Sequence, residues 1–333
     1  MTAMVQVENL TKYYGSYIGI EDVSFSMQAG EVVGFLGPNG AGKTTTMRVL
    51  TCSMPATEGV ARVAGHDVLQ DSLAVRRHVG YLPETPPVYP EMTVESYLRF
   101  AGTIKGIAKS DMPARLAHVL GVCGLEHMRS RTAGHLSKGY RQRVGIAQAL
   151  IHDPTVLIFD EPTSGLDPGQ IIEIRELLRE LGEDKTVILS THILAEAQMS
   201  CRRLLVINRG SIVGDIDLDA SGEVASVRTP GSDAVVYDGA RTIRVEVAGA
   251  TDGAAAAVRA LDGVNDVSEQ RTNGTLVLTA TTPAGEDHRA SIAQATLASG
   301  ADLLELREAR PSLERLFLDL TQTETTADAE AGE

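Results

Sequence analysis

The nine residues GPNGAGKTT, at Gly37–Thr45, constrain this chain more than any other segment. They follow the apolar run Val32–Leu36, overlap the start of the helical pattern Lys43–Thr51, and match the phosphate-loop pattern G-x-x-x-x-G-K-[ST]. Glycines let backbone N–H groups close around an oxyanion, Lys43 adds a mobile positive charge, and Thr44 supplies a hydroxyl that can ligate Mg²⁺. The dipole of the following helix points at the same phosphates. The sequence therefore predicts a nucleotide-binding domain rather than a simple glycine turn.

Length and composition allow a large buried core. The chain has 333 residues, of which 43% are hydrophobic, enough for about two domains. Its three cysteines show no metal or disulfide spacing, which suits a reducing cytosol. We expect no signal peptide, and no apolar stretch approaches the roughly 18 residues that span a bilayer. We therefore expect a chain that is soluble when isolated.

The chain is acidic. It carries 30 basic and 44 acidic residues, a net charge of −14, and only 4% of its residues are aromatic. An acidic field opposes non-specific binding to nucleic acid or to anionic lipid. We therefore expect no nucleic-acid partner.

Short apolar runs without alternation, joined by helical segments, are typical of a parallel sheet covered on both faces. This pattern predicts an α/β domain over residues 1–220. A helical pattern over about residues 86–152 interrupts it as an inserted subdomain, and a further amphipathic helix is expected at Gln170–Leu181. The expected strands are Val5–Leu10, Val23–Met27, Val32–Leu36, Val60–Val63, His78–Tyr81, Val156–Phe159 and Val187–Leu189.

The composition changes after residue 220. Residues 221–240 are rich in Gly, Ser, Asp and Ala and are predicted to form a linker or irregular segment. Residues 241–320 follow the order β-α-β-β-α-β, the split pattern of a ferredoxin-like α+β sandwich. Residues 321–333 form an acidic tail that we expect to be disordered.

Two acidic residues end the apolar strand Val156–Phe159. Open α/β sheets bind ligands beyond the carboxyl ends of their strands, where the phosphate loop also lies. There Asp160 can hold Mg²⁺ through water, and Glu161 can polarise an attacking water. His192, in LSTH, follows a strand at the same edge, and this position alone distinguishes it from the other histidines.

Two further segments have more than one interpretation. In LSKGYRQR, Ser137 is a natural N-cap and Gly139 allows close backbone approach to a ligand, but the residues alone favour an ordinary helix start. Tyr14, in KYYG, is either a stacking surface for a nucleobase or a core aromatic.

Five strings match the order and spacing of the ATP-binding cassette (ABC) family: GPNGAGKTT, LSKGYRQR, VLIFDEP, SGLD and LSTH. The resemblance covers roughly residues 4–215. Within the family, GYLPETPPVYPEMTV, LSKGYRQRVGIAQAL and LSTHILAEA resemble the subgroup that powers ABC-2-type export, above all the gliding-motility-type ATP-binding proteins. The C-terminal region is similar to an extension that many of those subunits carry.

The resemblance implies a RecA-like P-loop domain that binds and hydrolyses ATP with Mg²⁺. It implies that Glu161 is the general base, that His192 senses the γ-phosphate and that Asp160 serves the metal with Thr44. Tyr14 would stack on adenine. The residues expected to cradle the phosphates, with Lys43 also catalytic, are Gly37, Pro38, Asn39, Gly40, Ala41, Gly42, Lys43, Thr44 and Thr45.

The resemblance also implies that two subunits sandwich two nucleotides. Ser137 and Gly139 would contact the γ-phosphate of ATP held by the second subunit, and Asp167, in SGLD, would line the dimer seam. The sequence departs from the family at three positions. Glu84 replaces a glutamine, and it can bind Mg²⁺ but cannot donate a hydrogen bond as an amide does. Lys138 and Tyr140 replace the glycine and the glutamine of the LSGGQ-type motif.

Our first hypothesis is the ATP-hydrolysing subunit of an ABC-2-type membrane transporter, an exporter, bound to the cytoplasmic face of the cell membrane. Its partners would be an integral membrane permease on a separate chain, docking near the Glu84–Pro90 loop, and a second ATP-binding subunit in a homodimer. The alternative is a soluble mechanical ABC ATPase that acts on the ribosome or on DNA. A third hypothesis makes the C-terminal domain a ligand-sensing regulator that gates dimerisation.

Overall fold

The chain divides into two compact units, which are Met1–Leu218 with Thr229–Ser232, and Asp219–Arg228 with Asp233–Glu333. Over the described residues, no helix combines the length and the hydropathy needed to cross a bilayer. The computed structural model describes residues 3–228, 235–237, 241–249, 253–272, 275–283, 287–308 and 312–322.

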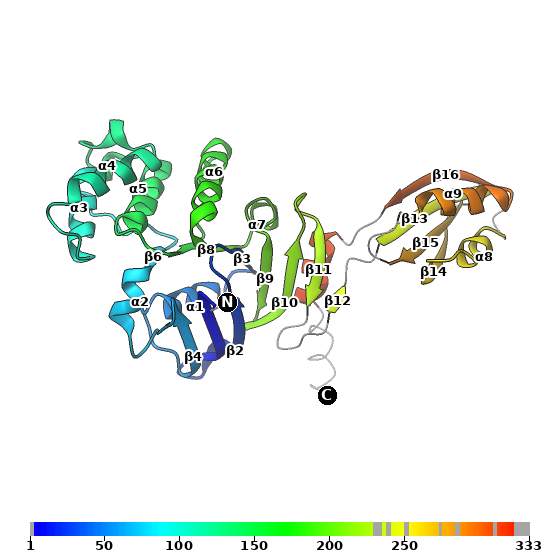
Figure 1. Cartoon of the computed structure of the whole chain (residues 1–333), viewed down its shortest axis with the longest axis horizontal. Helices are drawn as coiled ribbons and strands as arrows, with labels where there is room; N and C mark the ends of the chain where they lie inside the picture. The colour runs from blue at the N-terminus through cyan, green and yellow to red at the C-terminus, as the bar shows by residue number, and fades with distance from the viewer. Residues whose placement is uncertain are drawn as a thin grey trace. The chain divides into compact units, whose positions relative to one another are not determined.

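A largely parallel sheet forms the centre of the first unit (Figure 1). Its strands follow the order β10-β9-β3-β8-β7-β6, in which only the β9–β10 pair is antiparallel. Because the strands are parallel, the carboxyl ends of β3, β7 and β8 meet at one edge. The parallel sheet expected from the apolar runs is confirmed, while β9 and β10 were not expected. The bounds are β3 Val32–Leu36, β6 Val79–Leu82, β7 Val156–Asp160, β8 Thr186–Thr191, β9 Arg203–Asn208 and β10 Ser211–Leu218.

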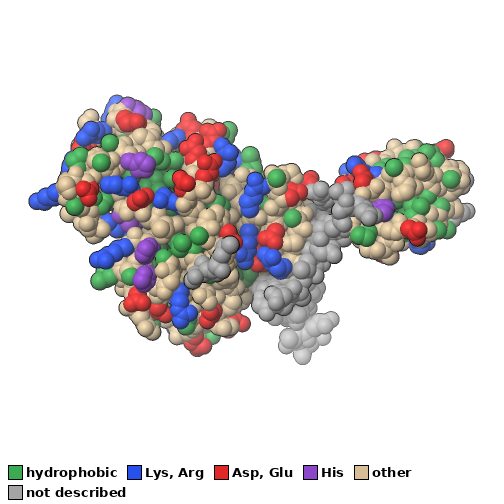
Figure 2. Space-filling view, viewed as in Figure 1, with side chains coloured by type: hydrophobic (Ala, Val, Ile, Leu, Met, Phe, Trp, Pro, Cys, Tyr) green, Lys and Arg blue, Asp and Glu red, His purple; other side chains and the backbone are tan. Residues whose placement is uncertain are grey.

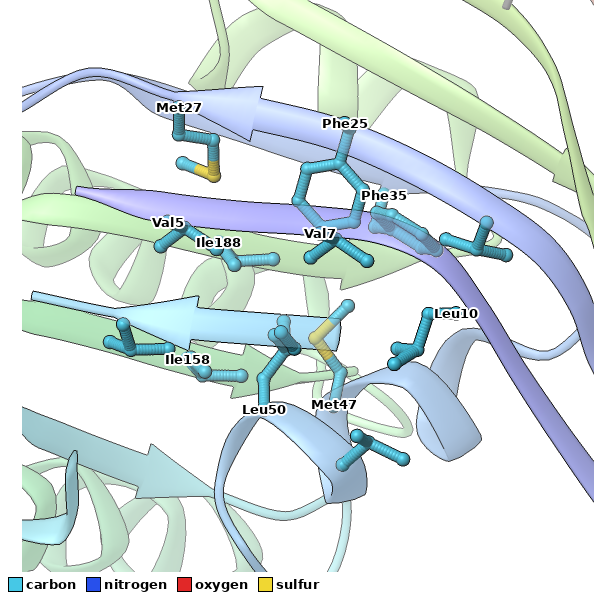
Figure 3. Close-up of a cluster of buried hydrophobic side chains, with 14 of the residues drawn as sticks. Val5, Val7, Leu10, Phe25, Met27, Phe35, Met47, Leu50, Ile158 and Ile188 are labelled. Atoms are coloured by element: carbon cyan, nitrogen blue, oxygen red, sulfur yellow. The ribbon is translucent and has the colours of Figure 1, made fainter. Parts of the chain in front are cut away.

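An antiparallel sheet in the order β2-β1-β4-β5 covers one side of this centre. Figure 3 shows its buried side chains, among them Val7 and Phe25, facing Phe35 and Ile188 of the central sheet, with Met47 of α1 (Lys43–Leu50) beside them. Fully burying an aliphatic or aromatic side chain stabilises a fold by about 1.5–3 kcal/mol. This core therefore anchors the phosphate loop at both ends. The strands are β1 Val5–Tyr14, β2 Tyr17–Met27, β4 Glu58–Val63 and β5 His66–Asp67.

The segment in which the sequence predicts an inserted helical subdomain contains three α-helices and two short 3-10 helices. Thr93 caps the first of them, because its side chain accepts a hydrogen bond from the backbone N–H of Ser96. The bounds are α3 Val94–Ile104, α4 Met112–Val122, η1 Glu126–Met128, η2 Ala133–His135 and α5 Lys138–Leu150. The other helices of this unit are α6 Pro168–Asp184 and two that were not expected, α2 Ser72–His78 and α7 Leu194–Ser200.

The side chain of Lys105, in the helical segment, donates hydrogen bonds to backbone carbonyls of the α/β core. Lys105 Nζ donates to the carbonyl oxygens of Arg76 and Val79, at 2.9 and 3.2 Å, where α2 ends and β6 begins. Burial, with the positive charge of Arg76, lowers the pKa of Lys105 to about 8. These contacts join the helical segment to the sheet that carries the phosphate loop.

The expectation of an irregular segment at residues 221–240 is confirmed for residues 221–223 and is wrong for residues 224–228 and 235–237. Strand β11 (Val224–Arg228) pairs antiparallel with β12 (Val235–Tyr237). Val224 and Val227 are buried and supply the apolar contacts that a strand requires, a signal that the surrounding Gly, Ser and Asp residues obscure. Residues 229–234 and 238–240 lie outside the described residues.

The remainder of the second unit has one four-stranded antiparallel sheet in the order β14-β15-β13-β16, with α8 and α9 among its elements. The bounds are β13 Arg241–Gly249, α8 Ala254–Arg259, β14 Asp266–Thr272, β15 Thr275–Thr282, α9 Arg289–Ala298, β16 Ala301–Glu308 and α10 Leu313–Gln322. The expected tail of residues 321–333 is corrected at its start, because Thr321 and Gln322 belong to α10. The rest of that tail lies outside the described residues.

Candidate active site

The phosphate loop leaves β3 at Gly37 and enters α1 at Gly42, and both positions require glycine. A Cβ at Gly37 would stand 2.2 Å from the carbonyl oxygen of Ile207. Gly42 has a φ of 109° and caps α1, a backbone conformation that only glycine adopts without strain. The chain therefore wraps a tight loop whose backbone N–H groups and helix N-terminus suit an anion.

Lys43 is buried at the base of this loop. Its Nζ donates to the carbonyl oxygens of Gly37, at 2.7 Å, and Pro38, at 3.1 Å. The same Nζ lies 3.3 Å from Oε1 of Glu161, which is buried and makes no hydrogen bond within the described residues. The ammonium group at the start of α1 thus lies beside a carboxylate that directly follows β7.

Glu161 directly follows β7 and has a φ of 49°, in the left-handed region that side chains other than glycine rarely adopt. Its N–H donates to both the carbonyl oxygen and Oγ of Ser190 on β8, at 3.1 and 3.2 Å. Its Oε2 lies 2.8 Å from Nδ1 of His192, whose side chain is 41% exposed. This strained backbone aims one carboxylate at Lys43 and His192 together.

Asp160 ends β7 and is only 1% exposed. Ser190 Oγ donates to its Oδ1, while its buried Oδ2 has no hydrogen-bond partner in the described part of the chain. Burial, together with the negative charge of Asp160, raises the pKa of nearby Tyr81 to about 12. A buried acceptor without a donor suits a water molecule on Mg²⁺, an ion that keeps several waters and takes one or two carboxylates. With the hydroxyl of Thr44 in the cavity, these residues fit a magnesium site.

A cavity of about 510 Å³ opens over the phosphate loop. Among the residues predicted for ATP and catalysis, those that line it are Tyr14, Asn39, Gly40, Gly42, Lys43, Thr44, Thr45, Glu84, Glu161 and His192. Four further lining residues were not predicted from the sequence: Tyr17, Gly19, Arg48 and Ser164. The predicted residues that do not line it are Gly37, Pro38, Ala41, Ser137, Gly139, Asp160 and Asp167.

Two tyrosines stand at the rim of this cavity. Tyr14 ends β1 and pairs across the hairpin with Tyr17, which begins β2. Tyr14 is 41% exposed, so it is not a core aromatic, and its hydroxyl contacts Thr45 Oγ1 at 3.4 Å and Met54 Sδ at 3.1 Å. Tyr17 is 62% exposed. The hairpin register itself could have identified Tyr17, since it places the two rings opposite each other.

Ser137, Gly139 and Asp167 gather at the starts of α5 and α6. Ser137 caps α5, its Oγ accepting from the N–H of Tyr140 at 3.3 Å, and Asp167 caps α6, its Oδ1 accepting from the N–H of Gln170 at 3.0 Å. A Cβ at Gly139 would stand 2.6 Å from the side chain of Gln170. The two helix starts therefore touch, and none of the three residues lines the cavity of its own chain.

The comparisons with known proteins agree with this geometry. The family model described as "ABC transporter" matches residues 20–164. The linearmycin resistance ATP-binding protein LnrL of Bacillus subtilis is 31% identical over 323 residues, which are 96% of this chain and 98% of that protein. The bacitracin transport ATP-binding protein BcrA of Bacillus licheniformis is 35% identical over 221 residues, covering 66% of this chain and 71% of BcrA.

The first unit also resembles solved structures. The dimeric ATP-binding cassette MJ0796, bound to ADP and Pi, matches with a TM-score of 0.60 and 27% identity, over 65% of this chain and all of that chain (100%). The phosphate loop at the edge of a parallel sheet, with an acidic pair beside it, defines a P-loop nucleotide-binding protein. The chain belongs to the ATP-binding subunits of the ABC transporter family, and it is an ATPase.

Proposed function

We propose that this chain powers an ABC-2-type exporter, and that it hydrolyses Mg·ATP in a dimer of nucleotide-binding domains. The observation that carries the proposal is the position of Glu161. One buried carboxylate lies within 3.3 Å of Lys43 and 2.8 Å of His192, beside a cavity lined by the phosphate loop. That arrangement suits a general base for water attack on a phosphoryl group.

Each residue has a distinct role in this proposal. Lys43 exchanges the carboxylate of Glu161 for the phosphates of ATP, and the freed carboxylate then accepts a proton from the attacking water. His192 contacts the γ-phosphate and holds Glu161 in place. Asp160 and Thr44 would hold Mg²⁺, with Glu84 in reach of the same cavity, and the ion supplies charge neutralisation on the phosphate oxygens when bound. Tyr14 stacks on adenine.

The helix tip at Ser137 and Gly139, and the loop at Asp167, need a second subunit in order to reach a nucleotide. All three lie outside the cavity of their own chain, and Ser137 and Asp167 are exposed. A helix N-terminus supplied by a partner can complete the charge stabilisation that phosphoryl transfer requires. The dimeric state of the MJ0796 cassette supports the same arrangement in a homodimer here.

Export and a membrane partner are supported by the relatives and by one surface. LnrL and BcrA are named for linearmycin resistance and bacitracin transport. On this chain, exposed Tyr89 and Phe100 lie 5.6 Å apart between ring centroids, and a cavity of about 320 Å³ lined by Pro83, Pro87 and Lys105 adjoins the same segment. Exposed aromatic groups of this kind mark interaction sites. An integral membrane permease docking here would hold the subunit at the cytoplasmic face of the membrane.

The charge of the surface also disfavours a nucleic-acid partner. Figure 2 shows acidic side chains gathered over α6, whose last turns contain Glu176, Glu180, Glu183 and Asp184. Such a surface repels a phosphate backbone.

We further propose the gliding-motility-type subgroup, and domain boundaries at residues 1–220, with the helical subdomain at about 86–152, and at 241–320. The sheet order β14-β15-β13-β16 in a β-α-β-β-α-β chain supports a ferredoxin-like fold for the C-terminal domain.

Affinity purification of the full chain from solubilised membranes tests the proposal. We expect an integral membrane protein to co-purify with it, and Phe100→Ser to reduce its recovery. Leu297→Ser, which changes an exposed leucine of α9, is the matched control and should leave recovery unchanged. Recovery of no integral membrane protein, or co-sedimentation with ribosomes or DNA at physiological salt, would contradict the proposed transporter role.

A further inference from the structure

A buried carboxylate outside the cavity connects the two loops that carry Glu161 and His192. Glu196 lies in the first turn of α7 and is 6% exposed. Its Oε2 accepts hydrogen bonds from Thr163 Oγ1, at 2.6 Å, and from Thr191 Oγ1, at 3.3 Å. One oxygen atom therefore accepts a hydrogen bond from a hydroxyl group next to each catalytic residue.

The two threonines are adjacent to the catalytic groups in sequence. Thr163 lies two residues after Glu161, and both threonines are buried. Thr191 ends β8 immediately before His192, and its Oγ1 also accepts from the N–H of Ile193 at 3.0 Å. A threonine hydroxyl has a single proton, so donation to Glu196 turns its lone pairs toward Ile193. The turn that carries His192 is thereby fixed from both sides.

Burying a carboxylate is costly unless its hydrogen bonds compensate. Over the described residues no Lys, Arg or His pairs with Glu196, and both hydrogen bonds to its Oε2 come from hydroxyl groups. An apolar residue of the same size would fill this space at lower cost, which argues for a role of the acceptor itself.

We propose that Glu196 is a positioning residue for ATP hydrolysis. It sets the separation between the loops after β7 and β8, and so maintains the contact between Glu161 and His192. This inference rests on the proposed roles of those two residues. It adds that their geometry depends on a further carboxylate, that of Glu196, which does not line the cavity.

The test compares Glu196→Leu with Glu196→Gln in the purified full chain. The leucine removes the acceptor, and a misplaced catalytic group should lower kcat roughly 10- to 100-fold. The KM for ATP should change less than about twofold, because the phosphate loop does not contact Glu196. The glutamine keeps one oxygen that can accept both hydroxyls, so this variant should retain kcat to within about threefold.

A double-mutant cycle guards against a general folding defect. Thr163→Val should lower kcat by itself and should cause little further loss when combined with Glu196→Leu. Thr296→Val removes a buried threonine hydroxyl from α9 and is the matched control, with kcat unchanged.

Two outcomes would overturn this inference. One is a Glu196→Leu variant with the parental kcat, and the other is a glutamine variant as impaired as the leucine variant. A parental chain that hydrolyses no ATP would instead remove the proposed function itself, so the two failures are distinguishable.

Discussion

Lys43 Nζ lies 3.3 Å from Oε1 of Glu161, so the cation of the phosphate loop and the candidate base form a buried ion pair. The pair joins the start of α1 to the end of β7, two elements more than 100 residues apart in the sequence. Because both groups are buried, the pair offsets part of the hydration that each loses, together with the carbonyl oxygens that Lys43 contacts and His192 beside Glu161. We therefore expect phosphate binding to compete with this pair, and so to link nucleotide binding to release of the candidate base.

Replacing Lys43 tests the binding half of this relationship. We expect Lys43→Ala to lose at least about tenfold in affinity for a fluorescent ATP analogue, because a charge-assisted contact to the phosphates is removed. The free energy of unfolding should fall by less than the roughly 3–5 kcal/mol typical of a broken buried pair, since His192 still contacts Glu161. Lys109→Ala, at an exposed lysine, is the control. Parental affinity in Lys43→Ala would contradict the assignment of the phosphate loop.

Tyr17 should contribute to base binding beside Tyr14, because it is exposed at the rim of the same cavity. Stacking of an aromatic side chain on a base is worth about 1–3 kcal/mol, so Tyr17→Ala should weaken ATP binding by roughly tenfold. Calorimetry with ATP and with inorganic tripolyphosphate separates the base from the phosphates. The affinity for tripolyphosphate should not change, and an equal loss for both ligands would show that Tyr17 acts on the loop.

His152 should make the fold sensitive to mild acid. Its Nε2 donates to the carbonyl oxygen of Val79 at 3.0 Å, and burial, with the positive charge of Lys105, lowers its pKa from 6.5 to about 4. Between these values the unfolded chain binds more protons than the folded chain. The contribution of neutral, buried His152 to the free energy of unfolding is therefore fully present above pH 6.5, and it is lost as the pH falls toward 4.

Urea denaturation across that pH range measures the effect. The free energy of unfolding of the parent should fall by up to about 3 kcal/mol more than that of His152→Gln, which keeps an N–H donor but does not titrate. His118→Gln, at an exposed histidine of α4, is the matched control and should follow the parent. Parallel pH profiles for the parent and His152→Gln would disprove this account of His152.

The sequence predicted the parts of the site that depend on local pattern. The phosphate loop is a contiguous motif, and Asp160, Glu161 and His192 follow from the rule that ligands bind beyond the carboxyl ends of parallel strands. Tyr17 was missed because its role depends on the hairpin register that places it opposite Tyr14.

Contacts between residues far apart in the chain could not be predicted from the sequence for a similar reason. Glu196 meets Thr163 across 33 residues, and only the packing of α7 beside the ends of β7 and β8 brings them together. In the second unit, the sequence predicts a linker where β11 forms, because short strands among Gly, Ser and Asp residues show weak periodicity. The sequence does not reveal that Val224 and Val227 are buried, and this burial favours a strand at that segment.

The most direct test of the account is ATP turnover and assembly of Glu161→Gln, with Glu180→Gln, an exposed site on α6, as the matched control. Phosphate release and light scattering are measured on the same samples with Mg·ATP. We expect turnover to fall by roughly 10²–10⁴, the usual contribution of a general base, while ATP is retained in a stable dimer. Parental turnover, or a nucleotide-bound variant that remains monomeric, would contradict the claim that Glu161 is the base of a dimeric ATPase.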